Sequence, residues 1–436
     1  DAELMRRLGK VGLPSYPMMV VSRCVALCSA AFVGQLGDTS ALAAVGLANV
    51  VTNVTGYTWL WGLSGAVSTM SAQDWGAGNY RAVGVTMQRG FWILVCFADL
   101  PLIFVWLSSR RLLEAVGQHP DVARLVGLYS SVRFPGILFM TANVVLTRTL
   151  ACMSNIRINL LASLGVAVLN VTLSATLIPR LGFVGAPITA TVCDAVETII
   201  ITILAFQDAD FRKCWPGIQR DAFRGWCAFL RVSCPSLALM GIEWWTWDLQ
   251  NLLAGLVSPL AQATQAVTPA LTDLQYCLGQ ALSNAAATVV GNLLGEGRAR
   301  AAARCCRLVM LLCFVAMTLQ GLLFLLLRHS IARVFTQDRE VRDSIERLLP
   351  LTLVFSFLDG NQAALTGIIQ AAGRQYLAAP LLLVCYWVVG VPLGLWLAFG
   401  QGWGLEGLWV GMLVAVALHF ASFAVAACRL DLDEVA

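Results

Sequence analysis

The chain has 436 residues, of which 58% are hydrophobic and 12% are charged, and its formal net charge is +4 at pH 7. Soluble domains contain about 25% charged residues, so this composition, with a mean hydropathy of +0.75, excludes a soluble protein and indicates an integral membrane protein. The basic residues are spread over polar loops, without the dense cluster that nucleic-acid binding requires. We therefore expect a lipid bilayer around the chain and no nucleic-acid partner.

Twelve apolar segments, taken in chain order, are long enough to cross a bilayer. Their lengths are typical of helices rather than of barrel strands. We therefore predict an all-α integral membrane protein with twelve transmembrane helices, at residues 11–33, 41–70, 83–109, 122–148, 157–179, 183–206, 228–257, 264–293, 303–328, 345–371, 376–399 and 405–428.

A long polar connection runs from Gln207 to Arg224, between the sixth and seventh segments. Because it leaves six segments on each side, we expect two pseudo-symmetric six-helix bundles around a central cleft. The expected limits are 1–206 for the N-terminal lobe, 207–227 for a cytoplasmic linker, 228–428 for the C-terminal lobe and 429–436 for a tail.

The two halves repeat short motifs at an offset of about 220 residues. The alternative is chance similarity between glycine-rich apolar segments, but four matches in the same order favour a repeat. Six spans per half give both halves the same orientation, which is the parallel repeat of alternating-access transporters. The matched pairs are Leu13-Pro14-Ser15 with Cys234-Pro235-Ser236, Gly76-Ala77-Gly78-Asn79 with Gly295-Glu296-Gly297-Arg298, Gly117 to Val122 with Phe335 to Val341, and Leu181 to Gly185 with Trp403 to Gly407.

If both chain termini are cytoplasmic, the loops that then face the cytoplasm contain more Lys and Arg than the loops on the other side. Cytoplasmic loops of membrane proteins carry an excess of these residues. We therefore place both termini and the central linker on the cytoplasmic side.

The seventh segment carries two acids, Glu243 and Asp248. A carboxylate in mid-membrane costs about 3 kcal/mol and usually marks a functional site. Glu243, Trp247 and Gln250 share one face of a helix, which suits binding of a proton or a cation, whereas Asp248 lies about 140° around the helix. The alternative is a structural role, in which neighbouring helices satisfy each acid with hydrogen bonds.

Two later segments also carry polar stripes at helical spacing. Asp273, Tyr276 and Gln280 lie on one face of the eighth segment, and Asp359 and Gln362 lie on one face of the tenth. Polar faces in lipid must turn inward, so we expect these stripes and Glu243 to line a wet cavity in the C-terminal half. The alternative is that the amides and hydroxyls only tie helices together.

Aromatic residues could form walls for this cavity, where their faces suit a hydrophobic cation. Tyr386, Trp247 and Trp387 are such candidates, with packing as the commoner role of any one ring. In the first half the deep acids are Asp99 and the pair Asp194 and Glu197. For that pair we favour a structural ion pair with Arg23 or Arg133 over a second titrating site, because intramembrane charges tend to find each other.

The sequence carries no motif for a metal, a cofactor or enzyme chemistry. The 14 Cys lack zinc spacing, and two of the three His, His119 and His329, fall in external loops. We find no nucleophile motif and no phosphate-binding loop. We therefore expect no metal, no cofactor and no catalytic residues.

The chain resembles the multidrug and toxic compound extrusion (MATE) family, in the eukaryotic branch that plants and animals share. The resemblance covers essentially the whole chain, and its most specific part is Glu243-Trp244-Trp245 with an acid five residues after Glu243. Its other carriers are Pro14, Val33-Gly34-Gln35-Leu36-Gly37, Gln73 to Gly78, Gln88-Arg89, Pro235-Ser236, Gly291 to Gly295, and Gly373-Arg374-Gln375.

The resemblance implies two six-helix lobes around a V-shaped cleft and export of organic, often cationic compounds in exchange for protons or sodium. It also implies coupling acids in the C-terminal lobe, where Glu243, Asp248 and Asp359 match acidic family positions. The first helix of many bacterial members carries an acid, whereas this chain has Arg23 there, which argues against coupling through that helix. Asp273, Asp194 and Glu197 match no family motif.

We therefore predict a monomeric proton antiporter that works by alternating access. It would export small organic compounds, chiefly hydrophobic cations, or metabolites across a plasma or vacuolar membrane. Its alternatives are a sodium-coupled exporter and a lipid flippase or channel of similar architecture. A membrane-embedded enzyme is the weakest alternative. The expected proton-coupling and substrate-binding residues are Glu243, Asp248, Asp359, Asp273, Gln250, Trp247, Gln362, Tyr276, Gln280 and Tyr386.

Overall fold

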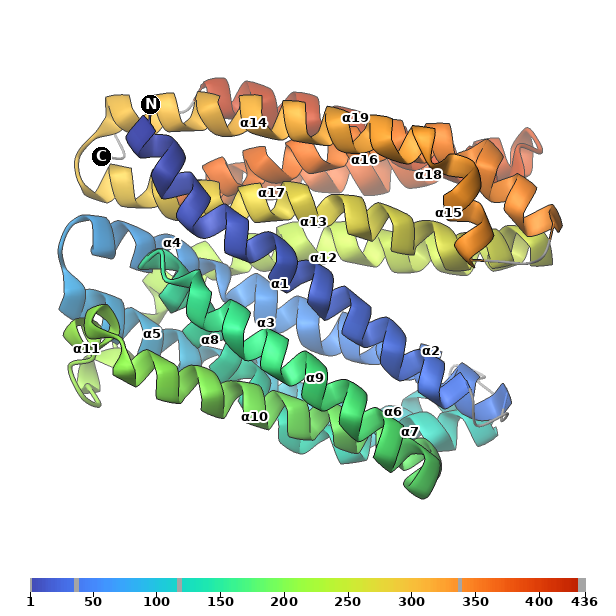
Figure 1. The fold of residues 1–436 in the computed structure, drawn as a ribbon, viewed down its shortest axis with the longest axis horizontal. Coiled ribbons are helices and arrows are strands. Elements are labelled where there is room, and N and C mark those ends of the chain that lie inside the picture. The colour runs from blue at the N-terminus through green and yellow to red at the C-terminus, as the bar shows by residue number, and fades with distance from the viewer. Residues whose placement is uncertain (1, 35–38, 116–119, 336–338, 430–436) are drawn as a thin grey trace. The chain divides into compact units, whose positions relative to one another are not determined.

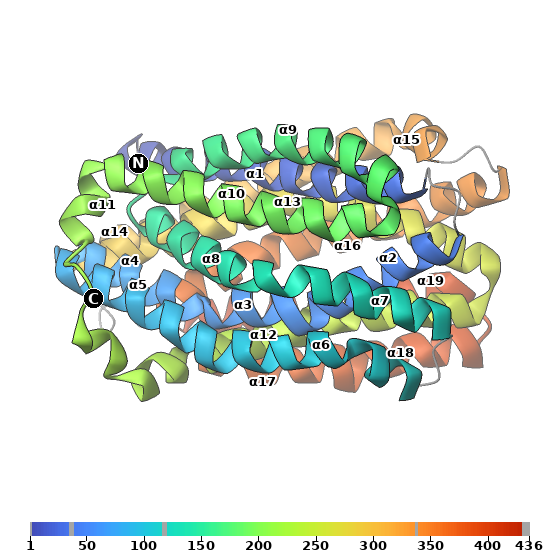
Figure 2. The same cartoon turned by 90° about the horizontal axis from the view of Figure 1, so that it is seen from below.

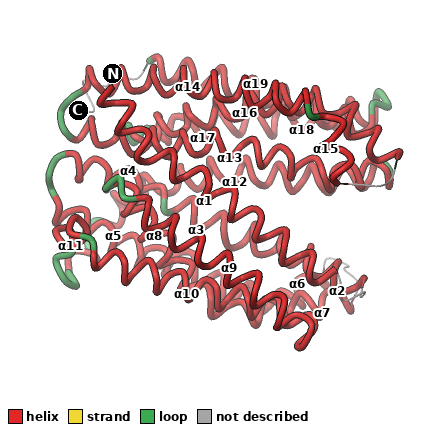
Figure 3. Tube along the Cα trace, in the orientation of Figure 1, coloured by secondary structure: helices red, strands yellow, loops and turns green. Residues whose placement is uncertain are grey.

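The computed structural model describes residues 2–34, 39–115, 120–335 and 339–429. Within these ranges every regular element is a helix, and the helices are joined by short turns and loops (Figure 3). The chain divides into two units. One unit is Leu13–Leu237, and the other is Asp1–Gly12 together with Ala238–Ala436. The domain limits expected from the sequence stay a prediction.

The unit Leu13–Leu237 contains most of α1 and the five helical stretches that follow it. These are α1 (Ala2–Gly34); α2 (Thr39–Thr52), π-helical Asn53–Tyr57, α3 (Thr58–Leu63) and α4 (Gly65–Gly76); α5 (Tyr80–Leu94), π-helical Val95–Asp99 and α6 (Leu100–Ala115); α7 (Pro120–Arg133), a 3-10 turn at Phe134–Gly136 and α8 (Ile137–Cys152); α9 (Ile156–Leu181); and, after a 3-10 turn at Gly182–Val184, α10 (Gly185–Gln207). The same unit holds the linker, with α11 (Ala209–Cys214) and a 3-10 turn at Arg220–Phe223, and the start of α12 (Trp226–Val257). Figure 2 shows α9 and α10 side by side, as their contacts require.

The second unit contains the rest of α12 and the helices that follow it. These are α13 (Pro259–Gly295), α14 (Ala299–Leu326), α15 (Arg328–Phe335), α16 (Arg339–Ala371), α17 (Gln375–Leu382), π-helical Leu383–Gly390, α18 (Val391–Leu395), π-helical Trp396–Gly400 and α19 (Gly404–Cys428). In Figure 1, α13, α14, α16 and α19 run along one another, and α16 packs against the other three. This places α16 at the centre of the unit.

Three of the helices start at residues whose side chains cap the first turn. Asn79 accepts a hydrogen bond from the backbone N–H of Ala82 at the start of α5. The side chains of Asp208 and Ser258 accept backbone N–H groups in the same way at the starts of α11 and α13. Pro259 occupies the first helical position of α13. Short oxygen-bearing side chains satisfy backbone donors that the first turn of a helix leaves free.

Two pairs of the repeated motifs adopt matching backbone conformations. Gly78 follows α4 with φ 74°, and its counterpart Gly297 follows α13 with φ 70°. Gly182 (φ 62°) and Gly404 (φ 58°) match in the same way. Positive φ is costly for residues with a Cβ. A positive φ at the same position of each motif therefore explains why both halves keep a glycine there.

In the part of the chain that the structure describes, seven helical stretches are long and apolar enough, by length and composition alone, to cross a membrane. One of them, Ile156–Gln207, contains both α9 and α10. The expected spans lie on the observed helices, except that the ninth was expected to reach residue 328, whereas α14 ends at Leu326 and α15 begins at Arg328. The seven stretches are Tyr80–Ala115, Pro120–Cys152, Ile156–Gln207, Ala299–Leu326, Arg339–Ala371, Ala379–Gly400 and Gly404–Cys428.

Candidate functional site

Glycines allow α13 and α16 to approach each other at backbone distance. A Cβ on Gly279 would lie 2.5 Å from Cα of Gly360, and a Cβ on Gly367 would lie 2.3 Å from the carbonyl oxygen of Ser283. Small residues allow this kind of close packing between membrane helices. Because the helices are so close, the polar stripes that the sequence predicts on them come together.

Gln362 on α16 links two of the predicted acids. Its Nε2 donates to Oδ1 of Asp359 at 3.0 Å and to Oε1 of Glu243 on α12 at 3.4 Å. Thr366 Oγ1 donates to Gln362 Oε1 at 3.2 Å. Since the hydroxyl contacts the amide oxygen, the amide NH₂ group is the end that faces the two carboxyl groups.

Three more predicted residues lie in electrostatic reach of these acids. Asp273 on α13 interacts with Asp359. Tyr386, in the π-helical stretch after α17, interacts with both Glu243 and Asp359 and with Tyr276 of α13. Asp359, Gln362 and Tyr386 are buried. We call Glu243, Asp273, Tyr276, Asp359, Gln362 and Tyr386 the acid site.

The remaining predicted residues lie in other surroundings. Trp247 packs edge-on against Phe355 and Trp409, with ring centroids 5.2 and 5.6 Å away. It therefore takes part in an aromatic core cluster. Gln280 donates to Asn284 Oδ1 at 3.5 Å along α13.

Gln250 and Asp248 carry buried polar atoms without partners. Among the described residues, Nε2 and Oε1 of Gln250 have no hydrogen-bond partner. The same is true of Oδ2 of Asp248. Gln250 is 3% exposed. Buried polar groups are usually satisfied, so each exception is a candidate for ligand binding. The wet cavity expected around the acids stays a prediction.

His419 is a polar residue near the acid site that sequence analysis did not select. It lies in the apolar helix α19, is 1% exposed, and its Nδ1 is 3.3 Å from Oη of Tyr386. Periodicity could not find it, because α19 has no polar stripe. A single imidazole inside an apolar span was the available signal, since intramembrane ionisable residues are functional candidates by default.

Several charged side chains buried in the unit Leu13–Leu237 have partners within that unit. Arg133 pairs with Asp194, as expected, and donates to Oη of Tyr57 at 3.1 Å. Glu197 accepts from Ser163 Oγ at 2.9 Å, and Asp99 accepts from Thr141 Oγ1 at 2.8 Å. The pairing of Asp194 with Arg133 confirms a structural ion pair for one member of the Asp194 and Glu197 pair.

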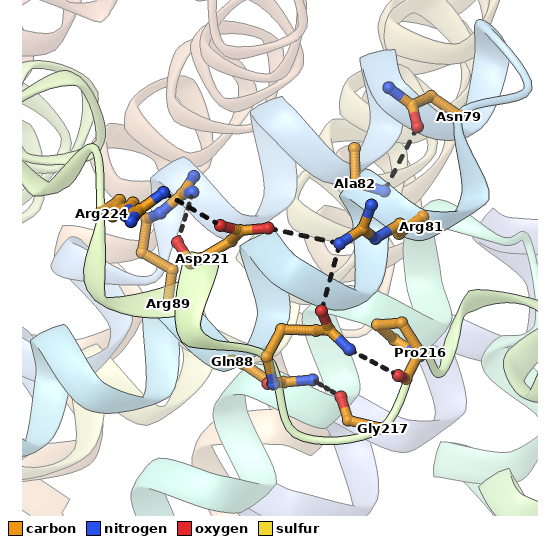
Figure 4. Close-up of polar contacts among 10 residues, drawn as sticks. Asn79, Arg81, Ala82, Gln88, Arg89, Pro216, Gly217, Asp221 and Arg224 are labelled. Carbon is orange, nitrogen blue, oxygen red and sulfur yellow. Dashed lines mark hydrogen bonds and ion pairs between the residues drawn. The ribbon is translucent and has the colours of Figure 1, made fainter.

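The Gln88-Arg89 motif holds the linker against α5 (Figure 4). Gln88 Nε2 donates to the Gly217 carbonyl at 2.8 Å, and Gln88 Oε1 accepts from the backbone N–H of Gln219 at 2.9 Å. Arg89 donates to the carbonyl oxygen of Asp221 at 3.2 Å. The two side chains therefore recognise linker backbone rather than a ligand.

Arg81 and Gly84 complete this attachment. Arg81 Nη2 contacts Oδ2 of Asp221 at 3.3 Å and Oε1 of Gln219 at 3.1 Å (Figure 4). Gly84 lies where a Cβ would come within 1.9 Å of the Cys214 carbonyl oxygen. Only a residue without a side chain leaves room for the linker here.

Among the described residues, no group of three or more His, Cys, Asp or Glu side chains is arranged to hold a metal ion. The acids of the acid site are linked through an amide instead. Their arrangement can bind and release protons or a cation.

Comparisons with known proteins agree with this architecture. The MatE family model matches residues 14–176 and 235–396. The chain is 31% identical over 439 residues to "Multidrug and toxin extrusion protein 2" of Mus musculus, covering 100% of this chain and 75% of that protein. It is 31% identical over 420 residues to "Protein DETOXIFICATION 13" of Arabidopsis thaliana, covering 95% and 86%.

Solved structures show the same fold. The crystal structure of the eukaryotic MATE transporter AtDTX14 matches with a TM-score of 0.93 at 24% identity, covering 100% of this chain and 97% of that one. The crystal structure of a point mutant of the Vibrio cholerae MATE transporter VcmN matches with a TM-score of 0.90 at 18% identity, covering 99% of both chains. These matches confirm the predicted fold class of twelve transmembrane helices in two six-helix bundles. The chain therefore belongs to the multidrug and toxic compound extrusion family of membrane transporters, in its eukaryotic branch.

Proposed function

We propose that the chain exports small organic cations of hydrophobic character in exchange for protons, and that Glu243 and Asp359 exchange those protons for substrate. The observation that carries this proposal is the amide of Gln362, which lies 3.0 Å from Asp359 Oδ1 and 3.4 Å from Glu243 Oε1. Two acids that share one donor form a single charged unit.

The charge of this unit explains why protons and cations would compete. Two carboxylates that contact the same amide nitrogen lie close enough to repel each other, and a nearby positive charge relieves that repulsion. A bound proton and a bound organic cation are therefore alternative ways to lower the negative charge. Asp273, in electrostatic reach of Asp359, strengthens the preference for positive charge.

The transport cycle follows from this competition. On the cytoplasmic side the ionised acids accept a cation, and on the far side protonation releases it. Each pH unit supplies about 1.4 kcal/mol per proton, and 100 mV acting on one charge supplies about 2.3 kcal/mol. Either term supports at least a tenfold gradient of substrate, with access alternating by movement of one repeat against the other.

The names of the relatives support the substrate class. The mouse relative is called a multidrug and toxin extrusion protein, and the plant relative is called a DETOXIFICATION protein. We propose that this chain acts as a monomer in a plasma or vacuolar membrane, with both termini cytoplasmic, because Lys and Arg favour that orientation.

Transport in reconstituted proteoliposomes tests the proposal. An imposed pH gradient should drive uptake of a fluorescent organic cation by the wild type. Glu243→Gln should abolish this uptake while leaving the unfolding temperature close to wild type. Glu406→Gln, which changes an exposed acid at the start of α19, is the matched control and should transport normally.

Unchanged pH-driven uptake by Glu243→Gln would refute the coupling role. Uptake that follows a sodium gradient and ignores the pH gradient would favour the sodium-coupled alternative. Movement of labelled lipid across the bilayer without proton counter-movement would favour a flippase.

A further inference from the structure

One face of α14 is basic at the start of the helix and apolar along the rest. Exposed residues recur on this helix every three or four positions, which places them on a single stripe. The basic stripe is Arg300, Arg304 and Arg307, and the apolar stripe that continues it is Leu311, Val315, Leu319 and Leu322. The change from cationic to apolar side chains therefore occurs within one turn.

The apolar stripe faces lipid. Leu311 and Leu319 are 60% and 63% exposed, and a Cβ added to Gly321 would meet no atom within 4 Å. On the other side of the helix Cys305 and Val309 are buried, and α14 packs against α13 and α16. A long row of uncovered apolar side chains marks a surface that contacts the membrane.

The length of the apolar run places the basic stripe at the membrane surface. Residues 308–327 contain no charged side chain, and at about 1.5 Å per residue they extend about 30 Å, the thickness of the hydrocarbon core. Arg307 then lies at the edge of the core, with Arg304 about 4.5 Å and Arg300 about 10.5 Å farther out. Since the headgroup layer is roughly 5–7 Å thick, the three side chains span the level of the lipid phosphates.

The basic stripe has no acid partner within the protein. Among the described residues, none of its three guanidinium groups has an ion-pair or hydrogen-bond partner, and α14 contains no Asp or Glu. Glu296, just before the helix, already contacts Arg298 at 2.9 Å and Arg7 at 2.7 Å. A guanidinium group binds phosphate through two parallel hydrogen bonds, so the stripe remains available for an external anion.

A hollow beside the basic stripe has room for a headgroup. Its volume is about 360 Å³, which is within the range of small-ligand sites. Three of its lining residues are arginines and none is an acid, so its chemistry favours a negative group. The lining residues are Gly297, Arg298, Ala299, Arg300, Ala301 and Arg304.

We propose that the basic stripe binds the phosphate of an anionic glycerophospholipid, whose acyl chains lie along the apolar stripe. A lipid matches both parts of this helix face, whereas a soluble anion would match the arginines alone. In the orientation proposed above, the lipid belongs to the cytoplasmic leaflet. The inference goes beyond the proposed function, because lipid binding requires neither substrate nor a proton gradient.

Native mass spectrometry of the full chain in detergent tests this site. The chain should bind palmitoyl-oleoyl-phosphatidylglycerol more tightly than the zwitterionic phosphatidylcholine with the same acyl chains. Each Arg→Gln change in the basic stripe should weaken phosphatidylglycerol binding about fivefold, and the triple variant about a hundredfold. Arg212→Gln, which removes an exposed arginine of α11, is the matched control and should bind normally.

Two further measurements separate a lipid site from general attraction to positive charge. Arg304→Lys keeps the charge but loses the forked donor geometry, so it should bind more weakly than wild type and more tightly than Arg304→Gln. A phosphatidylglycerol with a photoreactive group in its acyl chain should label the tryptic peptide 308–328, which contains the apolar stripe. Soluble glycerol phosphate lacks acyl chains and should bind on the order of a hundredfold more weakly.

Equal affinity for the two lipids, or wild-type affinity in the triple variant, would overturn the inference. Equal weakening by Arg212→Gln would indicate diffuse attraction instead, and glycerol phosphate binding as tight as lipid binding would indicate a site for a free anion. If the triple variant does not fold, Arg304→Gln and Arg304→Lys still decide. Because binding is measured without a gradient, its outcome is independent of pH-driven uptake by Glu243→Gln, which tests the proposed function.

Discussion

Gly84→Ala should detach the linker from α5. The added Cβ would lie 1.9 Å from the Cys214 carbonyl oxygen and 2.6 Å from Cδ of Pro216, whereas ordinary contacts begin near 3.4 Å. The linker backbone must therefore move by roughly 1.5 Å. That movement breaks the two hydrogen bonds of Gln88, which are 2.8 and 2.9 Å long.

The size of the effect follows from these contacts. Overpacking costs about 1–3 kcal/mol, and each lost hydrogen bond adds about 1 kcal/mol. We expect the free energy of unfolding to fall by about 3–5 kcal/mol. Thermal unfolding in detergent should show a midpoint several degrees lower, and limited trypsin digestion should cut faster in the linker.

Gly165→Ala is the matched control for this substitution. Gly165 lies in α9 with no atom within 4 Å of the added Cβ. Alanine there should be neutral or should stabilise by about 1 kcal/mol through helix propensity. If Gly84→Ala unfolds at the wild-type temperature and its linker resists trypsin equally well, the reasoning from close approach is wrong.

One further substitution and one labelling measurement test the unit Leu13–Leu237. Asp194→Asn leaves Arg133 buried without its charge partner and should lower the free energy of unfolding by about 3–5 kcal/mol; thermal unfolding measures this, and a wild-type midpoint would contradict a structural ion pair. Burial raises the pKa of the Cys214 thiol to about 12, so this thiol is protonated at pH 7 and should react with maleimide far more slowly than exposed Cys428. Mass spectrometry gives both rates, and equal rates would contradict burial of Cys214.

The sequence predicted the helices well because their signals are local. Apolar length alone located the spans, and the repeated motifs predicted two similar halves, in which Gly78 and Gly297 share a positive φ. The end of the ninth span was less accurate. Leu327 forms a turn between α14 and α15 with φ −90° and ψ 4°, and because this residue is itself apolar, hydropathy does not mark the break.

The site was predictable only within each helix. Spacing placed Asp359 and Gln362 on one face, and the structure shows their hydrogen bond. The contact between Gln362 and Glu243 joins residues 119 positions apart, so no periodicity could show it. The same holds for His419, whose partner Tyr386 lies on another helix, and for the role of Gln88 in holding the linker.

Trp247 shows a different limit of the sequence. Its helical position suggested a cavity wall together with Glu243, yet Phe355 and Trp409 surround its ring. The helix face on which a residue lies indicates the direction of its side chain, but not which neighbouring side chain it will contact. Aromatic clustering depends on the packing of three helices, and a single sequence does not encode that packing in a readable pattern.

The boundary between the two units falls inside α1, after Gly12, and inside α12, after Leu237. The first turns of α1 therefore belong to the unit of the second half of the chain, and the first turns of α12 belong to the unit of the first half. The ion pair of Arg7 with Glu296, at 2.7 Å, is an example. Two such halves on separate polypeptides would have to exchange these leading turns, as the arms of a domain-swapped dimer do. Because both halves stand on one chain, that exchange is intramolecular, and deletion of the first twelve residues should destabilise the unit that contains Ala238–Ala436.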